Sequence, residues 1–148
     1  MQIKFYNLYT HFICTTLNRM PLIPEKNRVR IEKYMTGIVK NLDSRMYAVY
    51  ANPEHAHILI SRSPRICEED IAERIAESTQ NFINDNKLSM GYFQWQNTAA
   101  AFSVSKSEID RVCKYILNQK EHHKNVSFAE EYEKMMKHHQ KTIMPFKK

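Results

Sequence analysis

Two histidines, His55 and His57, stand two residues apart in the segment NPEHAHILI, residues 52–60. Residues at positions i and i+2 of a β-strand project to the same face of the sheet, and the apolar run around this pair is typical of a strand. Two neutral imidazoles side by side can share one metal ion. Because two ligands are too few for a closed structural zinc site, a further ligand must come from elsewhere in the chain. The alternative interpretation is two polar residues on a solvated sheet face.

A tyrosine and a glutamine, Tyr115 and Gln119, form a second pair in the segment 105–124, which has helical spacing. At about 100° per residue, Tyr115 lies well away from the centre of the apolar stripe of this helix, so burial in the same core does not explain it. Side chains at positions i and i+4 stack on one helix face, which would bring a phenol and an amide oxygen together. The alternative interpretation is a tyrosine on the surface. The stripe consists of Ile109, Val112, Cys113, Ile116 and Leu117.

The elements that must position these two pairs follow the order βαββαβ, with helices appended after them. This order predicts an α+β fold, the ferredoxin-like βαββαβ sandwich, with an antiparallel sheet and two helices on one face. The tyrosine-bearing helix and a further short helix follow, with Ser105 and Glu108 at capping-box spacing, and the second sheet face needs a cover or a ligand. We expect strands at 4–16, 45–51, 55–61 and 99–105. Pro21 and Pro24 introduce a first helix, whose apolar residues run from Ile31 to Leu42, and further helices are expected at about 67–84, 105–124 and 128–140, before a short basic tail.

Length and composition limit the class of protein. The 148 residues fit one compact domain spanning 1–148. Its three cysteines, Cys14, Cys67 and Cys113, are far apart and lack metal-binding spacing, so we expect reduced, buried thiols in a cytoplasmic protein. The N-terminal residues are too polar for a signal peptide, and no apolar stretch is long enough to span a membrane. Only two glycines occur, which excludes the common phosphate-binding loops and a nucleotide cofactor held by them.

The net charge of +6 favours an anionic partner. Residues 66–105 carry 2 basic and 6 acidic side chains, whereas residues 1–65 carry 10 and 4 and residues 106–148 carry 10 and 6. A bound nucleic acid should therefore use the two ends of the sequence and avoid the middle. The alternative interpretation is an ordinary basic surface.

Taken together, HAH in a strand and YILNQ in a later helix resemble the single-tyrosine transposases of insertion sequences. These enzymes belong to the HUH superfamily, named for two histidines that flank a hydrophobic residue. The resemblance covers most of the chain, and it extends to the related repeat-associated tyrosine transposases. Further similar segments are YTHFICTTLNRMPLI, FQWQNTAAAFSVSKSEIDRVCKYILNQKEHHK and SFAEEYEKMMKHH.

The resemblance implies a single HUH transposase domain over residues 1–148 with a metal-dependent strand-transfer activity. Tyr115 would be the nucleophile that cleaves single-stranded DNA and becomes joined to a 5′ phosphate. His55, His57 and Gln119 would hold one divalent metal ion, Mg²⁺ or Mn²⁺. A free tyrosine, with a pKa of about 10, is a poor nucleophile at neutral pH, and a metal at the phosphate lowers the barrier. A DNA 3′ hydroxyl can then displace the tyrosine without ATP.

The implied partner is single-stranded or hairpin DNA at the ends of a mobile element. Members of the family commonly form homodimers, whereas the repeat-associated branch can act as a monomer. The candidate phosphate contacts are Arg19, Arg62, Arg65, Lys106, Arg111, Lys114 and Lys120. Arg111 is the best of them, because it precedes Tyr115 by one helical turn. The alternative interpretation of each of these side chains is an ordinary surface charge.

Three further features bear on this interpretation. The family often has a glycine-rich turn before AFSVS, whereas this sequence reads NTAAAFSVS, which would alter the loop that enters the last strand. His11, on the strand expected beside the histidine pair, is interpreted as structural, and His122 and His123 as solvated or DNA-facing. The alternative function is a catalytically inactive or domesticated nucleic-acid-binding module on the same fold. An active transposase forms a covalent DNA adduct, and such a module does not.

Overall fold

The computed structural model describes the backbone of residues 1–143 and the side chains of residues 1–138. The chain falls into two compact units, Met1–Leu117 and Asn118–Lys148. The basic tail expected at the C-terminal end lies outside the described residues from position 144 onward. A single domain over residues 1–148 stays a prediction.

A four-stranded antiparallel sheet forms the centre of the first unit. Its strands are β1 (Tyr9–Thr16), β2 (Arg45–Ala51), β3 (His55–Ser61) and β4 (Trp95–Val104), in the order β2-β3-β1-β4. The short loop after Ala51 closes β2 and β3 into the expected hairpin, where the Asn52 N–H donates to the His55 carbonyl at 2.8 Å. β3 pairs with β1 on one side and with β2 on the other, so the histidine strand lies inside the sheet. The α+β, ferredoxin-like fold is confirmed.

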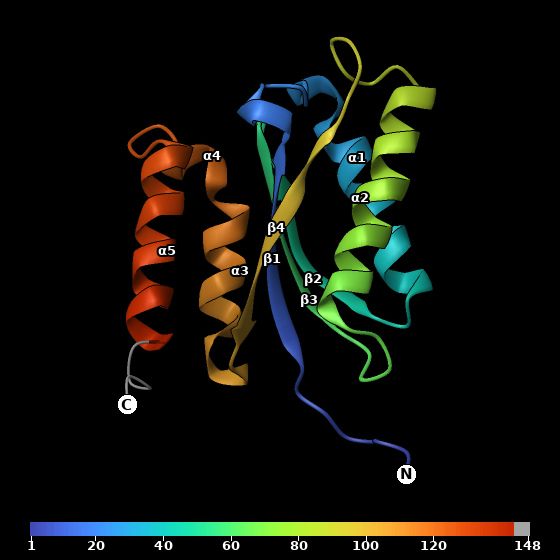
Figure 1. The fold of residues 1–148 in the computed structure, drawn as a ribbon, viewed down its shortest axis with the longest axis vertical. Helices are drawn as coiled ribbons and strands as arrows, with labels where there is room; N and C mark the ends of the chain where they lie inside the picture. The colour runs from blue at the N-terminus through green and yellow to red at the C-terminus, as the bar shows by residue number, and fades with distance from the viewer. Residues whose placement is uncertain (144–148) are drawn as a thin grey trace. The chain divides into compact units, whose positions relative to one another are not determined.

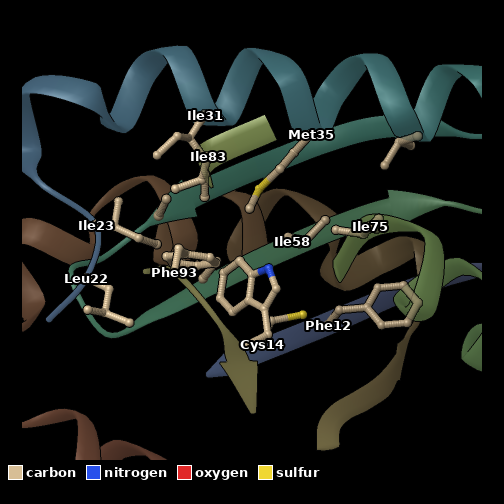
Figure 2. Packing of buried hydrophobic residues seen from close by; sticks show 14 of the residues in the cluster. Phe12, Cys14, Leu22, Ile23, Ile31, Met35, Ile58, Ile75, Ile83 and Phe93 are labelled. Atoms are coloured by element: carbon tan, nitrogen blue, oxygen red, sulfur yellow. The ribbon is translucent and has the colours of Figure 1, made fainter. Parts of the chain in front are cut away.

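Two helices, α1 (Glu25–Asn41) and α2 (Glu68–Asp85), cover one face of this sheet (Figure 1). Their buried residues recur every four positions, as the helical periodicity predicts, and they meet the alternate residues of β1 and β3 that point to the same face. Figure 2 shows Ile31 and Met35 of α1 directed toward the core that contains Ile58 of β3. At the side of this core, Tyr34 stacks on Phe82 with ring centroids 3.9 Å apart.

The second face of the sheet is covered by α3 (Ile109–Leu117), the helix that carries Tyr115 (Figure 1). Ile109 and Ile116 of α3 pack against Leu59 of β3 and two residues of β2, Ala48 and Tyr50. The cover that the fold requires on this face is therefore supplied by the same helix that presents the expected nucleophile. Among residues 1–143, no helix has both the length and the apolar character needed to span a lipid bilayer.

Several expected boundaries are wrong. β1 begins at Tyr9 and not at residue 4. β4 begins at Trp95, so all of the segment NTAAAFSVS except its last residue lies within β4 and not in a loop before it. The expected helix 105–124 is three elements, namely the 3-10 turn η2 (Lys106–Glu108), α3, and α4 (Gln119–His122). Ser105 makes no side-chain cap; its carbonyl accepts the Glu108 N–H instead. The last helix, α5 (Phe128–Ile143), is confirmed.

The three cysteines are free thiols, but they are not all buried as expected. Cys67 is exposed at the N-cap position of α2, where its side chain makes no capping hydrogen bond, and Cys113 is only half-buried. Cys14 lies in the core below the sheet, and burial raises the pKa of its thiol to about 12 because a buried thiolate is poorly solvated.

We therefore expect the three thiols to differ sharply in their alkylation rates. The thiolate fraction of Cys14 at pH 8 is on the order of 10⁻⁴ with this pKa, so iodoacetamide should modify Cys67 at least about 10³-fold faster than Cys14. Peptide mass spectrometry after timed labelling measures both rates, and labelling in denaturant gives the reference. Similar rates for Cys14 and Cys67 in the folded protein would contradict the placement of Cys14 in the core.

The core should respond strongly to truncation at its centre. Ile58 is fully buried between the sheet and its helices, whereas Ile3 is 55% exposed. We expect Ile58→Ala to lower the free energy of unfolding by about 2–5 kcal/mol, because a cavity remains. The matched control Ile3→Ala should change it by less than about 0.5 kcal/mol. Urea unfolding followed by circular dichroism measures both values, and equal effects would place the core elsewhere.

Candidate active site on the second face of the sheet

The two histidines lie side by side, as the strand spacing predicts. His55 and His57 both project from β3 to the face that α3 covers, and both side chains are buried. Their ring centroids are 5.0 Å apart and the ring planes are inclined by 76°. Two buried imidazoles this close together could supply two ligands to one small cation.

His55 is held at both ring nitrogens by residues of the β2–β3 turn. Its Nδ1 lies 2.7 Å from Oε1 of Glu54, and its Nε2 lies 3.1 Å from the amide nitrogen of Asn52. An amide N–H can only donate, so Nε2 is the nitrogen with the lone pair, and the Nδ1–H donates to the Glu54 carboxylate. The turn therefore sets the tautomer of His55, with the proton on Nδ1 and the lone pair on Nε2.

His57 is held at Nδ1 by another histidine. Nε2 of His11 lies 2.9 Å from Nδ1 of His57, and the two ring centroids are 5.1 Å apart. His11 comes from β1, where it is paired with Leu59 of β3, and its ring packs near Phe102 of β4. The expectation of a structural role for His11 did not include this direct contact with a candidate ligand.

Tyr115, on α3, contacts the histidine pair from the helix that covers this face of the sheet. Its ring lies edge-on to the His57 ring, with centroids 5.7 Å apart and planes inclined by 88°. The side chain is half-buried and packs at the margin of the cluster between α3 and β2. Three of the four residues expected to carry the chemistry, His55, His57 and Tyr115, therefore lie together in the first unit.

A second tyrosine, Tyr50, also faces His57, from the neighbouring strand β2. It is only 8% exposed, and the Arg28 guanidinium lies 4.5 Å above its ring. Burial raises the pKa of Tyr50, although the charge of Arg28 opposes the rise. Tyr50 is thus a covered phenol, less accessible to a substrate than Tyr115.

Gln119 belongs to the second unit, and its place among the ligands stays a prediction. The expected continuous turn from Tyr115 to Gln119 is wrong, because the helix is interrupted at Asn118, whose φ and ψ are −98° and 17°. Within its own unit, the Gln119 Oε1 accepts a hydrogen bond from Nε2 of His123 at 2.7 Å. The oxygen retains a second lone pair, so this bond leaves it able to ligate a cation.

His122 and His123 are not solvated or DNA-facing residues as expected. His122 Nε2 lies 2.8 Å from the carboxylate of Glu131, and His123 Nε2 lies 3.5 Å from the same carboxylate. His123 also uses Nδ1 to reach the Val126 carbonyl at 2.8 Å. The pair therefore joins α4 to α5 inside the second unit. The sequence signal for this network, Glu131 on the apolar margin of the last helix, could not be interpreted without a structure.

The candidate phosphate contacts differ in their exposure to solvent and in the partners that they already have within the chain. The Arg111 side chain is 82% exposed, one turn before Tyr115 on α3, and its Nε pairs at the surface with Glu108. Arg62, in contrast, is committed to the loop after β3, because it donates to Glu68 at 2.7 Å and to the carbonyls of Ser63 and Ile66. The remaining exposed candidates are Arg19, Arg65, Lys106, Lys114 and Lys120.

The donor atoms at this site fit a divalent cation. Two imidazole nitrogens are neutral ligands of borderline softness, and an amide oxygen as a third ligand would add no charge. Such a set accepts Mn²⁺, Mg²⁺ or Zn²⁺, and it leaves coordination positions for phosphate oxygens.

Comparisons with known proteins bear on the family and on the fold. The family described as IS200-like transposases matches residues 4–119. A candidate transposase from Deinococcus radiodurans R1 has a similar solved structure, with a TM-score of 0.63, 17% identity, and coverage of 80% of this chain and 95% of that one. A REP-associated tyrosine transposase, solved bound to a REP hairpin, gives a TM-score of 0.58 with 11% identity, covering 85% and 75%. No curated protein sequence matches.

Proposed function

Because the chain belongs to the family of IS200-like transposases, we propose that it cleaves and rejoins single-stranded DNA through a 5′-phosphotyrosine formed at Tyr115. The observation that carries this proposal is the Tyr115 ring against the His57 ring, with centroids 5.7 Å apart. These residues come from distant parts of the sequence. A phenol beside paired imidazoles is what metal-assisted nucleophilic attack by tyrosine requires.

The Tyr115 hydroxyl is the nucleophile of the proposed reaction. Its oxygen forms a bond to the phosphorus of a phosphodiester, the bond from phosphorus to the 3′ oxygen breaks, and the phenol proton is transferred so that a 3′ hydroxyl leaves. The 5′ phosphate remains joined to the tyrosine, which conserves the energy of the diester bond. A second DNA 3′ hydroxyl then attacks the phosphotyrosine, rejoining the DNA and restoring the phenol without ATP.

His55, His57 and Gln119 are the proposed ligands of one divalent cation, magnesium or manganese. When bound, the cation neutralises charge that develops on the phosphate oxygens and on the leaving oxygen. The chain supplies the positions: β3 fixes both imidazoles inside the sheet, and α3 fixes the phenol against them. This rigid placement favours in-line attack, because little motion of the reacting groups remains to be lost.

The proposed substrate is single-stranded DNA that carries a hairpin. Support comes from the structural neighbour that was solved bound to a REP hairpin and from the exposed cations near the nucleophile. The proposed phosphate contacts are Arg111 and Lys114 on α3, Arg19 at the end of the 3-10 turn η1 (Leu17–Arg19), and Arg65 in the loop after β3. Arg62 is proposed to act indirectly, by holding the loop after β3 in place. Such contacts make the affinity fall steeply with salt concentration.

The proposal is tested with hairpin-containing single-stranded DNA taken from the flanks of the gene. We expect a protein–DNA adduct that survives denaturation, that requires Mg²⁺ or Mn²⁺, and that disappears with chelator. The matched control is the same sequence annealed to its complement, which removes the single-stranded target. Binding without any adduct, across several flanking sequences, would favour the inactive nucleic-acid-binding module.

A further inference from the structure

The His11–His57 contact connects a third buried histidine to the proposed metal site. We propose that His11 is a positioning residue, which accepts a hydrogen bond from Nδ1–H of His57 and thereby makes Nε2 of His57 the ligand atom. The proposal rests on the proposed function in one respect, that His57 is a metal ligand. Its geometric basis is the 2.9 Å separation of His11 Nε2 and His57 Nδ1.

A hydrogen bond between two neutral imidazoles contains one proton, and its position has consequences for His57. If His11 donated the proton, Nδ1 of His57 would be the acceptor, and the proton of His57 would be on Nε2, where it blocks metal binding. If His57 donates, its Nε2 has the lone pair that a metal needs. Metal binding through Nε2 therefore requires His11 to be the acceptor.

His55, the other histidine of β3, is also held by a partner at Nδ1. Nδ1 of His55 donates to Glu54, and Nε2 of His55 accepts from the Asn52 amide. Both histidines of β3 are thus engaged at Nδ1 by a residue of the first unit, Glu54 in one case and His11 in the other. Outer partners of this kind fix the tautomer and the orientation of a ligating imidazole.

The position of His11 suits this role for two reasons. It lies on β1, a strand inside the sheet and directly paired with β3, so its ring is held rigidly; it is also 5% exposed. A neutral imidazole as acceptor adds no charge to the site, whereas a second carboxylate would bind the His57 proton more strongly and change the charge around the cation. Phe102, with its ring centroid 6.4 Å from that of His11, packs on the side toward β4.

Two substitutions separate the acceptor from the shape of the ring. His11→Gln places an amide oxygen near the position of Nε2 and keeps an acceptor, whereas His11→Phe keeps a ring and removes the acceptor. Titration of Mn²⁺ followed by electron paramagnetic resonance should show a loss of affinity of about 10–100-fold for His11→Phe, and less than about tenfold for His11→Gln. Equal losses for the two variants would overturn the proposal. His11→Leu serves as a second apolar variant if the phenylalanine variant does not fold.

The tautomer is measured directly by nitrogen NMR of histidine-labelled protein without metal, with the signals of His57 assigned by their loss in His57→Gln. We expect a protonated Nδ1 and an unprotonated Nε2 for His57 in the wild-type protein, and a shift toward protonated Nε2 in His11→Phe. A protonated Nε2 in the wild-type protein would overturn the proposal. Absence of Mn²⁺ binding by wild-type protein would instead contradict the proposed function, and the NMR result would still decide the role of His11.

Discussion

Replacement of Tyr115 by phenylalanine should abolish the covalent protein–DNA adduct while leaving the fold and the binding of hairpin DNA intact. Phenylalanine retains the ring that lies 5.7 Å from the ring of His57, so the packing of α3 on the sheet is preserved. Removal of a hydroxyl nucleophile costs on the order of 10⁶-fold in rate, which takes the reaction below detection. Denaturing gel electrophoresis with labelled DNA measures the adduct, and fluorescence anisotropy measures the binding.

The matched control for this experiment is Tyr50→Phe. Tyr50 also faces His57, from β2, but it is buried, and burial raises the pKa of its phenol. We expect Tyr50→Phe to form the adduct at a rate within about tenfold of wild type, because only packing and the contact with Arg28 are altered. An adduct that persists in Tyr115→Phe and disappears in Tyr50→Phe would move the nucleophile to β2.

Replacement of His57 by alanine should remove both metal binding and adduct formation. Loss of an outer partner of a metal ligand already costs about 10–100-fold in affinity, so loss of the ligand itself should lower Mn²⁺ affinity by more than about 100-fold. The same change also removes the 2.9 Å hydrogen bond between His57 Nδ1 and His11 Nε2, and loss of a buried hydrogen bond costs about 1–3 kcal/mol of stability. Isothermal titration with Mn²⁺ and thermal unfolding measure the two effects separately.

Leu59→Ala is the control that distinguishes a ligand from a merely buried residue. Leu59 follows His57 on the same face of β3 and packs beneath α3. Its truncation should lower the free energy of unfolding by about 2–5 kcal/mol and leave Mn²⁺ affinity nearly unchanged in protein that remains folded. If Leu59→Ala lost metal binding as fully as His57→Ala, the effect of the histidine would be one of stability alone.

The arrangement of the sheet and the histidine pair could be predicted from the sequence because both depend on local periodicity. Alternation along 55–61 places His55 and His57 on one face, and four-residue spacing identifies the buried stripes of α1 and α2. The tight turn of residues 52–54, which joins β2 and β3 into a hairpin, can likewise be predicted from the local sequence. Each of these features depends only on residues that are close together in the sequence, within one helix or one hairpin.

The contacts that complete the site could not be predicted, because they depend on register between distant strands. In the register of β1 and β3, Ile13 lies opposite His57, so His11 is a diagonal neighbour of His57 on the same face of the sheet. The contact between the two rings depends on this register. The break at Asn118 has no glycine or proline to mark it, so a continuous helix is the simpler expectation. Likewise, the charge of Arg62 is visible in the sequence, but its engagement with Glu68 is not.

The most direct measurement of the central claim is the chemical identity of the residue joined to DNA. The wild-type adduct is formed with hairpin DNA and Mn²⁺, trimmed by nuclease, digested with protease and fragmented by mass spectrometry. We predict a nucleotide joined through its 5′ phosphate to the oxygen of Tyr115, on the peptide that follows Lys114. A nucleotide attached to any other side chain, or attached through a 3′ phosphate, would contradict the account.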